Sequence, residues 1–254
     1  MDTRTLTHGR RLAALLAVVP LAAACGGGHD GNLGGRPGPE PPALSRGTHL
    51  LITTDNGVRL RPADGERAAT DRHVTSRWFR HDDTWTLDLT CTDPDGHDRP
   101  DCPRMPVVAV PAGTSVTVTA RNAGVDAVGV EAELDLTTVN GDVTVTRSGR
   151  DDASVRLVTR NGSVRTSTLH SVRLHAETVN GDVTIGSATS PAGLTALTTN
   201  GSVRVALPHD SPDYRTTATA RNGRTSVTVP GPTGGTGHAM SLTTVNGDVT
   251  AARD

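Results

Sequence analysis

The chain has 254 residues and a formal net charge of −2. This charge supplies neither the basic field that nucleic-acid binding needs nor an acidic tail. Aromatic residues make up only 2% of the sequence, with one Phe, one Tyr and two Trp. A globular core of this length normally uses more aromatic bulk, whereas a narrow repeat interior can be filled by stacked Val, Leu, Ile and Thr. We therefore expect a repeat fold and no nucleic-acid partner.

The first 24 residues have the pattern of an export signal. Arg4, Arg10 and Arg11 precede an apolar run, residues 12–24, which is interrupted by Pro20. This run is too short to span a bilayer as a permanent helix. We expect residues 1–24 to be a signal peptide and the protein to be exported.

The residue after this segment is Cys25, which follows Ala22, Ala23 and Ala24 in a run that resembles the lipobox of bacterial lipoproteins. By that resemblance Cys25 carries a lipid and anchors the protein to the extracytoplasmic face of the cell membrane. The alternative is cleavage of an ordinary signal, which leaves Cys25 as a free thiol. Residues 25–47 favour lipidation, because they are rich in Gly and Pro and read as a tether that cannot pack a core.

The other two cysteines, Cys91 and Cys102, enclose a short polar loop. In an exported protein such a pair is most simply a disulfide. We expect this bond within residues 48–106, which we interpret as an N-terminal strand followed by a cap. The Asp-rich stretch 93–101 offers a second reading, a site for a hard cation, although it lacks the spacing and the distal Glu of a calcium loop. We expect no metal or cofactor, and the cation alternative stays open.

A heptapeptide built around Asn-Gly recurs along the chain, and most of its copies lie in a repeat domain that we place at residues 107–254. From the second copy on, the Asn residues are spaced by 21, 19, 20, 22 and 24 residues. Such a period is typical of repeat architectures, in which each unit buries its apolar face against its neighbours. The corners, which we interpret as structural, are Asn56-Gly57, Asn140-Gly141, Asn161-Gly162, Asn180-Gly181, Asn200-Gly201, Asn222-Gly223 and Asn246-Gly247. Asn122 belongs to a degenerate copy.

Apolar and polar residues alternate between these corners, as where Leu134 and Leu136 flank Asp135. This period of two, with many Val and Thr residues, predicts short strands with one buried face. After residue 25 no stretch keeps a helical apolar stripe. The fold class is therefore all-β.

Two all-β architectures fit the pattern. Asn-Gly is a strong hairpin signal, which favours an antiparallel hairpin meander or a sandwich. In a parallel β-solenoid, each repeat is one coil and equivalent strands stack about 4.8 Å apart. After Asn-Gly the repeats alternate between Asp-Val-Thr and Ser-Val-Arg, which keeps like charges apart in a parallel stack. We therefore expect the parallel solenoid, with successive coils as neighbours.

The solenoid makes a specific geometric demand on the charged residues. Residues two and four positions after Asn point to the same side of a strand. Arg165 should therefore lie diagonally between Asp142 and Asp182, and Arg204 should reach back toward Asp182. The four residues Asn140, Asn161, Asn180 and Asn200 should form a single column.

Three of the chain's four Phe, Trp and Tyr residues lie in one short segment as Trp78, Phe79 and Trp85. Such a cluster could stack a sugar or a peptidoglycan fragment. Our preferred interpretation is that it caps the N-terminal end of the solenoid, where strand edges and apolar side chains would otherwise be open.

The run 110–118, followed by repeated Thr-x-Asn-Gly-Asp/Ser-Val, resembles a family of bacterial adhesin-like proteins, the domain of unknown function 4097. The resemblance covers residues 107–254 and extends to a strand near residues 49–60. It implies a β-solenoid-like domain on the outer face of the cell envelope. The family name supports a function only weakly, because a fold does not determine what a protein binds.

The sequence lacks the common nucleophile-elbow, zinc-protease and phosphate-loop motifs. We expect a surface-anchored, non-enzymatic lipoprotein that binds a glycan, peptidoglycan or an envelope protein. The alternatives are a carbohydrate-active β-helix enzyme and an accessory or sensor protein in envelope-stress signalling. An acidic groove with converging carboxylates would favour the enzyme, whereas a flat face of Thr and Arg would favour binding.

The lipid anchor can be tested directly. Because the lipid is attached through the sulfur, Cys25→Ala should release the protein into the medium or leave it unprocessed. Membrane fractionation of the variant and the N-terminal mass of the unaltered protein measure this. Unchanged fractionation together with an unmodified N-terminal mass would rule the anchor out.

Overall fold

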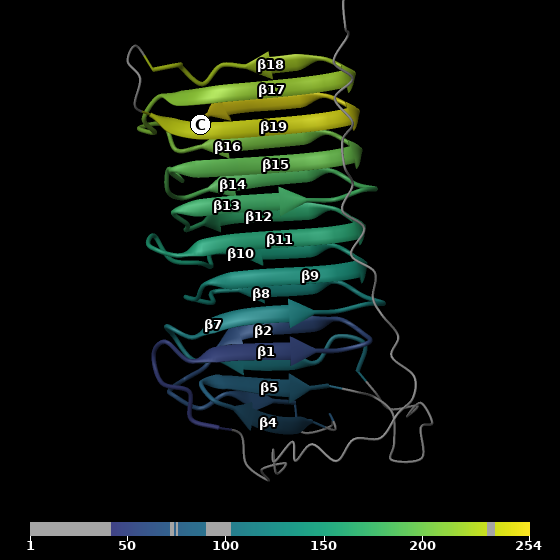
Figure 1. Ribbon diagram of the computed structural model, residues 1–254, viewed down its shortest axis with the longest axis vertical. Helices are drawn as coiled ribbons and strands as arrows, with labels where there is room; N and C mark the ends of the chain where they lie inside the picture. Colours follow the sequence, from purple (N-terminus) through teal and green to yellow (C-terminus); the bar gives the residue numbers. More distant parts are fainter. Residues whose placement is uncertain (1–41, 72–73, 75, 90–102, 233–236) are drawn as a thin grey trace, which may run out of the picture. The chain divides into compact units, whose positions relative to one another are not determined.

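The computed structural model describes residues 42–71, 74, 76–89, 103–232 and 237–254, which belong to one compact unit. This part of the chain is all-β, and its strands form two sheets of ten strands each (Figure 1). No helix in it is long and apolar enough to cross a membrane. The signal segment, Cys25, the Cys91 and Cys102 pair and the Asp-rich stretch 93–101 lie outside the described residues.

In each sheet the strands lie side by side from the C-terminal end of the stack to its N-terminal end. The first sheet consists, in this spatial order, of β17 (Tyr214–Asn222), β19 (His238–Asn246), β15 (Gly193–Asn200), β13 (Arg173–Glu177), β11 (Ser154–Asn161), β9 (Leu134–Asn140), β7 (Ser115–Thr119), β1 (His49–Thr53), β5 (Thr84–Asp88) and β4 (Arg77–His81). The second sheet consists of β18 (Thr225–Val227), β20 (Val249–Arg253), β16 (Val203–Leu207), β14 (Val183–Ser187), β12 (Val164–Leu169), β10 (Val143–Thr146), β8 (Val125–Val128), β2 (Val58–Pro62), β6 (Val107–Val110) and β3 (Ala69–Thr70).

Neighbouring strands are parallel and in register, except for β4 and β3 at one end of each sheet, which pair antiparallel. On β9, Leu134 and Leu136 are buried, and Leu136 pairs with Leu157 of β11. A period of two along each strand thus becomes a column of like residues through the stack. The expected parallel solenoid is confirmed, and the strands on either side of each Asn-Gly enter different sheets instead of forming a hairpin.

The corner asparagines form the expected column. The side-chain amide of each Asn after Asn140 donates from Nδ2 to Oδ1 of the adjacent Asn on the N-terminal side of the stack. These bonds are Asn161 to Asn140 at 2.9 Å, Asn180 to Asn161 at 2.9 Å, Asn200 to Asn180 at 2.8 Å, Asn246 to Asn200 at 2.8 Å and Asn222 to Asn246 at 2.8 Å. Since identical side chains satisfy one another, the column fixes the register of the coils.

The glycine after each Asn is required by close packing between coils. Gly201 has a φ of +153°, and a Cβ built there would lie 2.0 Å from the carbonyl oxygen of Gly181 in the adjacent coil. The Thr two positions before Asn uses the same contact, because Thr198 Oγ1 donates to the Gly181 carbonyl oxygen at 2.8 Å. Thr198 is only 5% exposed, so this bond satisfies polar groups that water reaches poorly.

The order of the coils at both ends differs from the expected succession. The coil of β19 and β20, the last in the chain, lies between the β15/β16 coil and the β17/β18 coil. At the other end, the β1/β2 coil lies between β5/β6 and β7/β8. The expectation that successive coils are always neighbours is therefore wrong at the ends.

The composition of the last two coils explains their exchange. Met240 and Leu242 of β19 are buried at 2% and 0% exposure. Their partners on the outer strand β17 are Thr216 and Ala218, which are small and only partly buried. At these two positions the stack thus places the bulky apolar pair inside and the small pair at its open end, which removes more apolar surface from water.

Hydrogen bonding favours the same order. The position of the recurring corner Thr is taken by Ala220 in the β17/β18 coil, which has no hydroxyl to donate. With the β17/β18 coil at the end, the Gly247 carbonyl is the one that lacks a Thr hydroxyl as donor, because Ala220 faces it. The Gly201 carbonyl, inside the stack, then accepts from Thr244 Oγ1 at 2.7 Å. In chain order, the Gly201 carbonyl would lose this donor inside the stack, and an unpaired buried carbonyl is costly.

The N-terminal boundary of the folded part also differs from the expected one. Leu44, which we assigned to a tether unable to pack a core, is 2% exposed and belongs to the core cluster. Its backbone N–H donates to Glu66 O at 2.7 Å, and Ala43 bridges to Arg67. The folded part therefore begins no later than Pro42. The strands of residues 48–106 join the same two sheets as those of 107–254.

The corner geometry yields a stability prediction. Gly201→Ala should lower the free energy of unfolding by about 2 kcal/mol or more, because the new Cβ meets a backbone oxygen and the residue disfavours its φ. Gly231→Ala is the matched control, since a Cβ there meets nothing within 4 Å. Urea unfolding of both variants measures the difference, and equal stabilities would contradict the close packing of the corners.

Candidate functional site

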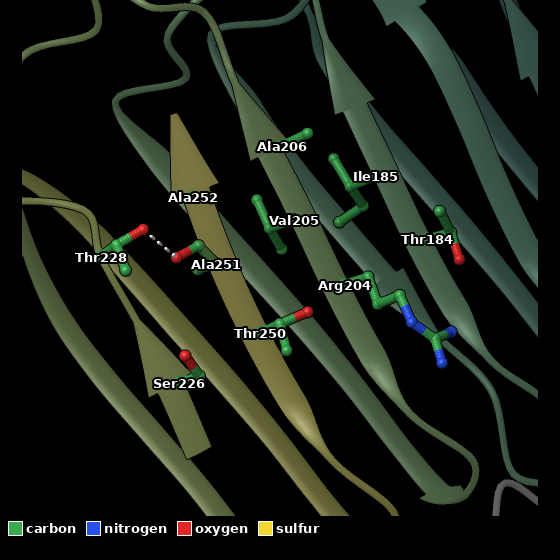
Figure 2. Close-up of a pocket in the computed structure, with 10 residues that line it drawn as sticks. All are labelled: Thr184, Ile185, Arg204, Val205, Ala206, Ser226, Thr228, Thr250, Ala251 and Ala252. Atoms are coloured by element: carbon green, nitrogen blue, oxygen red, sulfur yellow. Dashed lines mark hydrogen bonds between the residues drawn. The ribbon is translucent and has the colours of Figure 1, made fainter. Parts of the chain in front are cut away.

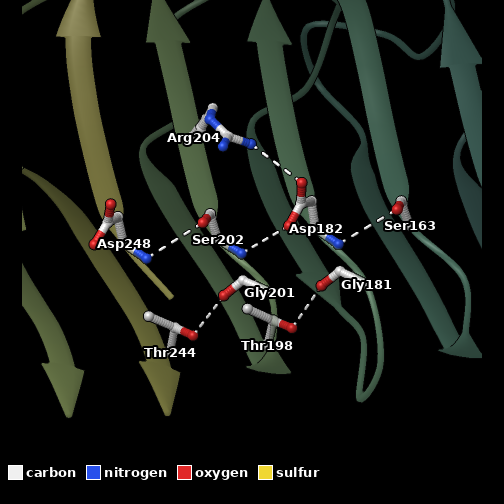
Figure 3. A network of polar contacts seen from close by, with 9 residues as sticks. All are labelled: Ser163, Gly181, Asp182, Thr198, Gly201, Ser202, Arg204, Thr244 and Asp248. Carbon is white, nitrogen blue, oxygen red and sulfur yellow. Dashed lines mark hydrogen bonds and ion pairs between the residues drawn. The ribbon is translucent and has the colours of Figure 1, made fainter. Parts of the chain in front are cut away.

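The Asp and Ser residues two positions after the corner asparagines form a polar ladder, and Figure 3 shows four of them, Ser163, Asp182, Ser202 and Asp248. In spatial order its members are Asp142, Ser163, Asp182, Ser202 and Asp248. The Ser202 backbone N–H donates to Asp182 Oδ1 at 2.8 Å, and the Asp248 backbone N–H donates to Ser202 Oγ at 3.2 Å. The inserted last coil therefore continues the alternation of Asp and Ser, so that no two carboxylates are adjacent.

Arginines two positions further along the strands pair with these carboxylates. Arg165 Nη1 donates to Asp142 Oδ2, and Arg204 Nη1 donates to Asp182 Oδ2 at 3.2 Å. Arg61 forms a similar pair with Asp126 at 2.7 Å nearer the N-terminal end. The expected diagonal contacts are thus present. Because the paired side chains of the ladder are about half exposed, each pair contributes little stability, about 0.2–1 kcal/mol.

The environment of Asp182 favours its ionised form. The Ser202 backbone N–H contributes most, and the guanidinium of Arg204 adds to it, so the pKa of Asp182 is lowered from its ordinary value. A carboxyl held in this way keeps its charge and its hydrogen bonds at neutral pH. Its contacts fit a register-setting role within the ladder.

The outward face of the second sheet carries a row of hydroxyl and guanidinium groups in register. Its members, in spatial order, are Thr144, Arg165, Thr184, Arg204, Thr250 and Ser226. We call this face the Thr/Arg face. Neighbouring members stand one strand spacing apart, about 4.8 Å, so the row presents donors at a constant interval.

A shallow hollow of about 320 Å³ lies on the Thr/Arg face over β14, β16, β20 and β18 (Figure 2). Arg204, Thr184, Thr250 and Ser226 line one side of it. Its floor is low because Ala206 pairs with Ala252 and with Gly186, so three adjacent strands carry small outward residues. The hollow thus combines an apolar floor with a polar rim, which suits an extended polar ligand that also has an apolar face.

A second hollow, of about 490 Å³, lies among the loops on the opposite side of the coils from the asparagine column. Arg150 forms two hydrogen bonds with Asp152, at 2.9 and 2.8 Å, and His170 Nδ1 lies 2.8 Å from Asp151. The first pair raises the pKa of Arg150 and lowers that of Asp152. Four of its charged or titratable side chains, those of Arg150, Asp151, Asp152 and His170, are therefore paired with one another.

The aromatic residues singled out in the sequence are divided between the two sides of the first sheet. Trp78 is 3% exposed within the core, and Trp85 packs against that core with the Arg80 guanidinium 5.8 Å from its ring centroid. Phe79 alternates with Trp78 along β4 and pairs with Thr86 on the outward face. The three rings do not form one continuous platform.

At the other end of the stack the single tyrosine closes the core. Tyr214 is fully buried, donates from its hydroxyl to Pro191 O at 2.7 Å and meets the His238 ring edge-on at 5.2 Å. Burial raises the pKa of Tyr214 to about 12.

Within the described residues, no group of three or more His, Cys, Asp or Glu side chains is placed to hold a metal ion.

Comparison with known protein families identifies the repeat domain. The profile of the family described as Toastrack DUF4097 matches residues 113–252. The chain belongs to this family. Among solved structures, it is similar to the crystal structure of a "putative cell adhesion protein" from Clostridium sporogenes, with 9% sequence identity and a TM-score of 0.38. That similarity covers 85% of this chain and 96% of the other. No protein with a curated description matches the chain.

Proposed function

We propose that this member of the Toastrack DUF4097 family is an adhesin-like, non-enzymatic binding protein of the cell envelope. In this proposal Cys25 anchors the exported chain to the membrane, and the solenoid presents the Thr/Arg face to an envelope polymer. The polymer is a glycan or peptidoglycan strand rather than a nucleic acid, because the net charge of −2 offers no attraction for a phosphate backbone.

The observation that carries this proposal is the Thr/Arg face itself. Its side chains come from parallel strands in strict register, so their backbone positions cannot move independently of the sheet. A rigid row of donors loses little conformational freedom when a ligand binds, which favours binding of a long repeating ligand through many weak contacts. The hollow above Ala206 and Ala252 gives that ligand one place to bury an apolar surface.

The environment of Asp142 and Asp182, the carboxylates of the ladder that pair with arginines of the Thr/Arg face, supports binding over glycoside hydrolysis. A general acid in such enzymes needs a raised pKa, so that it holds a proton at neutral pH. The pKa of Asp182 is lowered instead, by the Ser202 backbone N–H and by Arg204. Asp142 is similarly paired with Arg165. These carboxylates are positioned to orient arginines, whose remaining donors face solvent and can reach ligand oxygens.

The proposal is tested by measuring binding of the exported protein to isolated peptidoglycan and to an array of envelope glycans. We expect one polymer class to bind. Ala206→Arg fills the floor of the hollow from an outward position, so it should weaken that binding about tenfold or more. Thr195→Arg is the matched control, because it adds the same side chain to an outward position of β15 in the first sheet.

Three results would contradict the proposal. Equal binding by the two variants would remove the Thr/Arg face from the interaction. Turnover of any polysaccharide by the purified protein would favour the carbohydrate-active enzyme instead. Absence of binding to all polymers, with binding to an envelope signalling protein, would favour the accessory or sensor role.

A further inference from the structure

We propose that Asn222 is a site of spontaneous deamidation, and that its modification opens the end of the stack. Asn-Gly is the dipeptide most open to this reaction, because glycine places no Cβ near the attacking nitrogen. The chain holds seven such dipeptides. In the described structure the glycine N–H of six of them donates to a backbone carbonyl, and that of Asn222-Gly223 does not.

The reaction needs a free backbone nitrogen. The nitrogen of the glycine loses its proton and attacks Cγ of the preceding Asn, and the bond from Cγ to the side-chain nitrogen then breaks, so that ammonia leaves. The resulting succinimide is opened by water to aspartate or isoaspartate. An N–H held in a hydrogen bond is harder to deprotonate and cannot swing toward Cγ without breaking that bond.

In the interior of the stack every corner glycine is held in this way. The N–H of each donates to the backbone carbonyl of the corner Asn in the adjacent coil, on the C-terminal side of the stack. These bonds are Gly141 to Asn161 at 2.8 Å, Gly162 to Asn180 at 3.0 Å, Gly181 to Asn200 at 2.9 Å, Gly201 to Asn246 at 2.9 Å and Gly247 to Asn222 at 3.2 Å. Gly57 donates to Arg104 O at 3.1 Å. The five other asparagines of the column also accept an amide hydrogen bond at Oδ1, namely Asn140, Asn161, Asn180, Asn200 and Asn246.

Asn222 and Gly223 form the corner of the outermost coil, beyond which no further coil lies in the described structure. Within the described residues, the Gly223 N–H has no acceptor and Asn222 Oδ1 has no donor. Gly223 is also exposed, whereas the other corner glycines are buried or half-buried. Both the nucleophile and the carbon that it attacks are therefore accessible at this corner.

Modification of Asn222 would weaken the link to the next coil. The Asn222 amide donates to Asn246 Oδ1 at 2.8 Å, and a carboxylate at this position would face that oxygen without a proton to donate. Isoaspartate would in addition lengthen the backbone of a corner that packs closely on Gly247. As the end coil loosens, Gly247 loses its Asn222 acceptor, so Asn246 becomes the next reactive site. Ser226 of the same coil lines the hollow on the Thr/Arg face, so loosening of this coil would also alter the hollow.

The test follows each Asn by peptide mapping while the folded, exported protein is incubated at mildly alkaline pH. Because Arg221 and Arg224 flank the corner, the protease must not cut at arginine. We expect Asn222 to deamidate about tenfold or more faster than Asn161, since two hydrogen bonds that protect the interior corner are missing. The same protein unfolded in urea is the control, and there the Asn-Gly sites should react at similar rates.

Two variants test the opening of the stack. Asn222→Asp mimics the product and should accelerate deamidation of Asn246, whereas Asn222→Gln keeps the amide and should not. A rate at Asn222 in the folded protein no greater than at Asn161 would overturn the proposed site. Equal rates at Asn246 in the two variants would overturn the proposed opening.

Discussion

The fold depends on one contact, the approach of each Asn-Gly corner to the corner of the coil beside it. The Gly backbone lies so close to the neighbouring Gly carbonyl that no side chain fits between them. The Thr hydroxyl, the Gly N–H and the Asn amide at that corner each find their partner in an adjacent coil. Because all three bonds require the same register, a slip of one residue would break them together and turn every apolar side chain outward.

The same constraint determines which coil can be last. Each coil from β9/β10 to β15/β16 has a Thr two positions before its corner Asn, a short polar residue two positions after it and apolar inward side chains. The β7/β8 coil, also inside the stack, has Ala120 and Gly124 at the first two of these positions. The β17/β18 coil has Ala220 and Arg224 at the corner and the small residues Thr216 and Ala218 facing inward, so it fits best where one side is open. The later β19/β20 coil satisfies all three conditions and lies inside. The residues of a coil, rather than its place in the sequence, therefore determine which coil lies at the end of the stack.

The features imposed by repetition were predictable from the sequence. They include the asparagine column and the pairs of Arg165 with Asp142 and of Arg204 with Asp182, because parallel stacking makes residues at the same repeat position neighbours. The exchange at the C-terminal end was not predicted. Its signals are Ala220 in place of Thr and Arg224 in place of Asp or Ser, but a departure from a repeat does not by itself say where a coil lies.

The hollow and the folded N-terminal boundary depend on contacts that are distant in sequence. Ala206 and Ala252 form the hollow's floor only because the last coil inserts beside β16. Leu44 and Ala43 are two adjacent apolar residues in a stretch rich in Gly and Pro, so no periodicity indicated that Leu44 packs. Amide hydrogen exchange of the corner glycines tests the coil order most directly. Our account predicts a protected Gly247 and a rapidly exchanging Gly223, whereas a protected Gly223 with a rapidly exchanging Gly247 would contradict it.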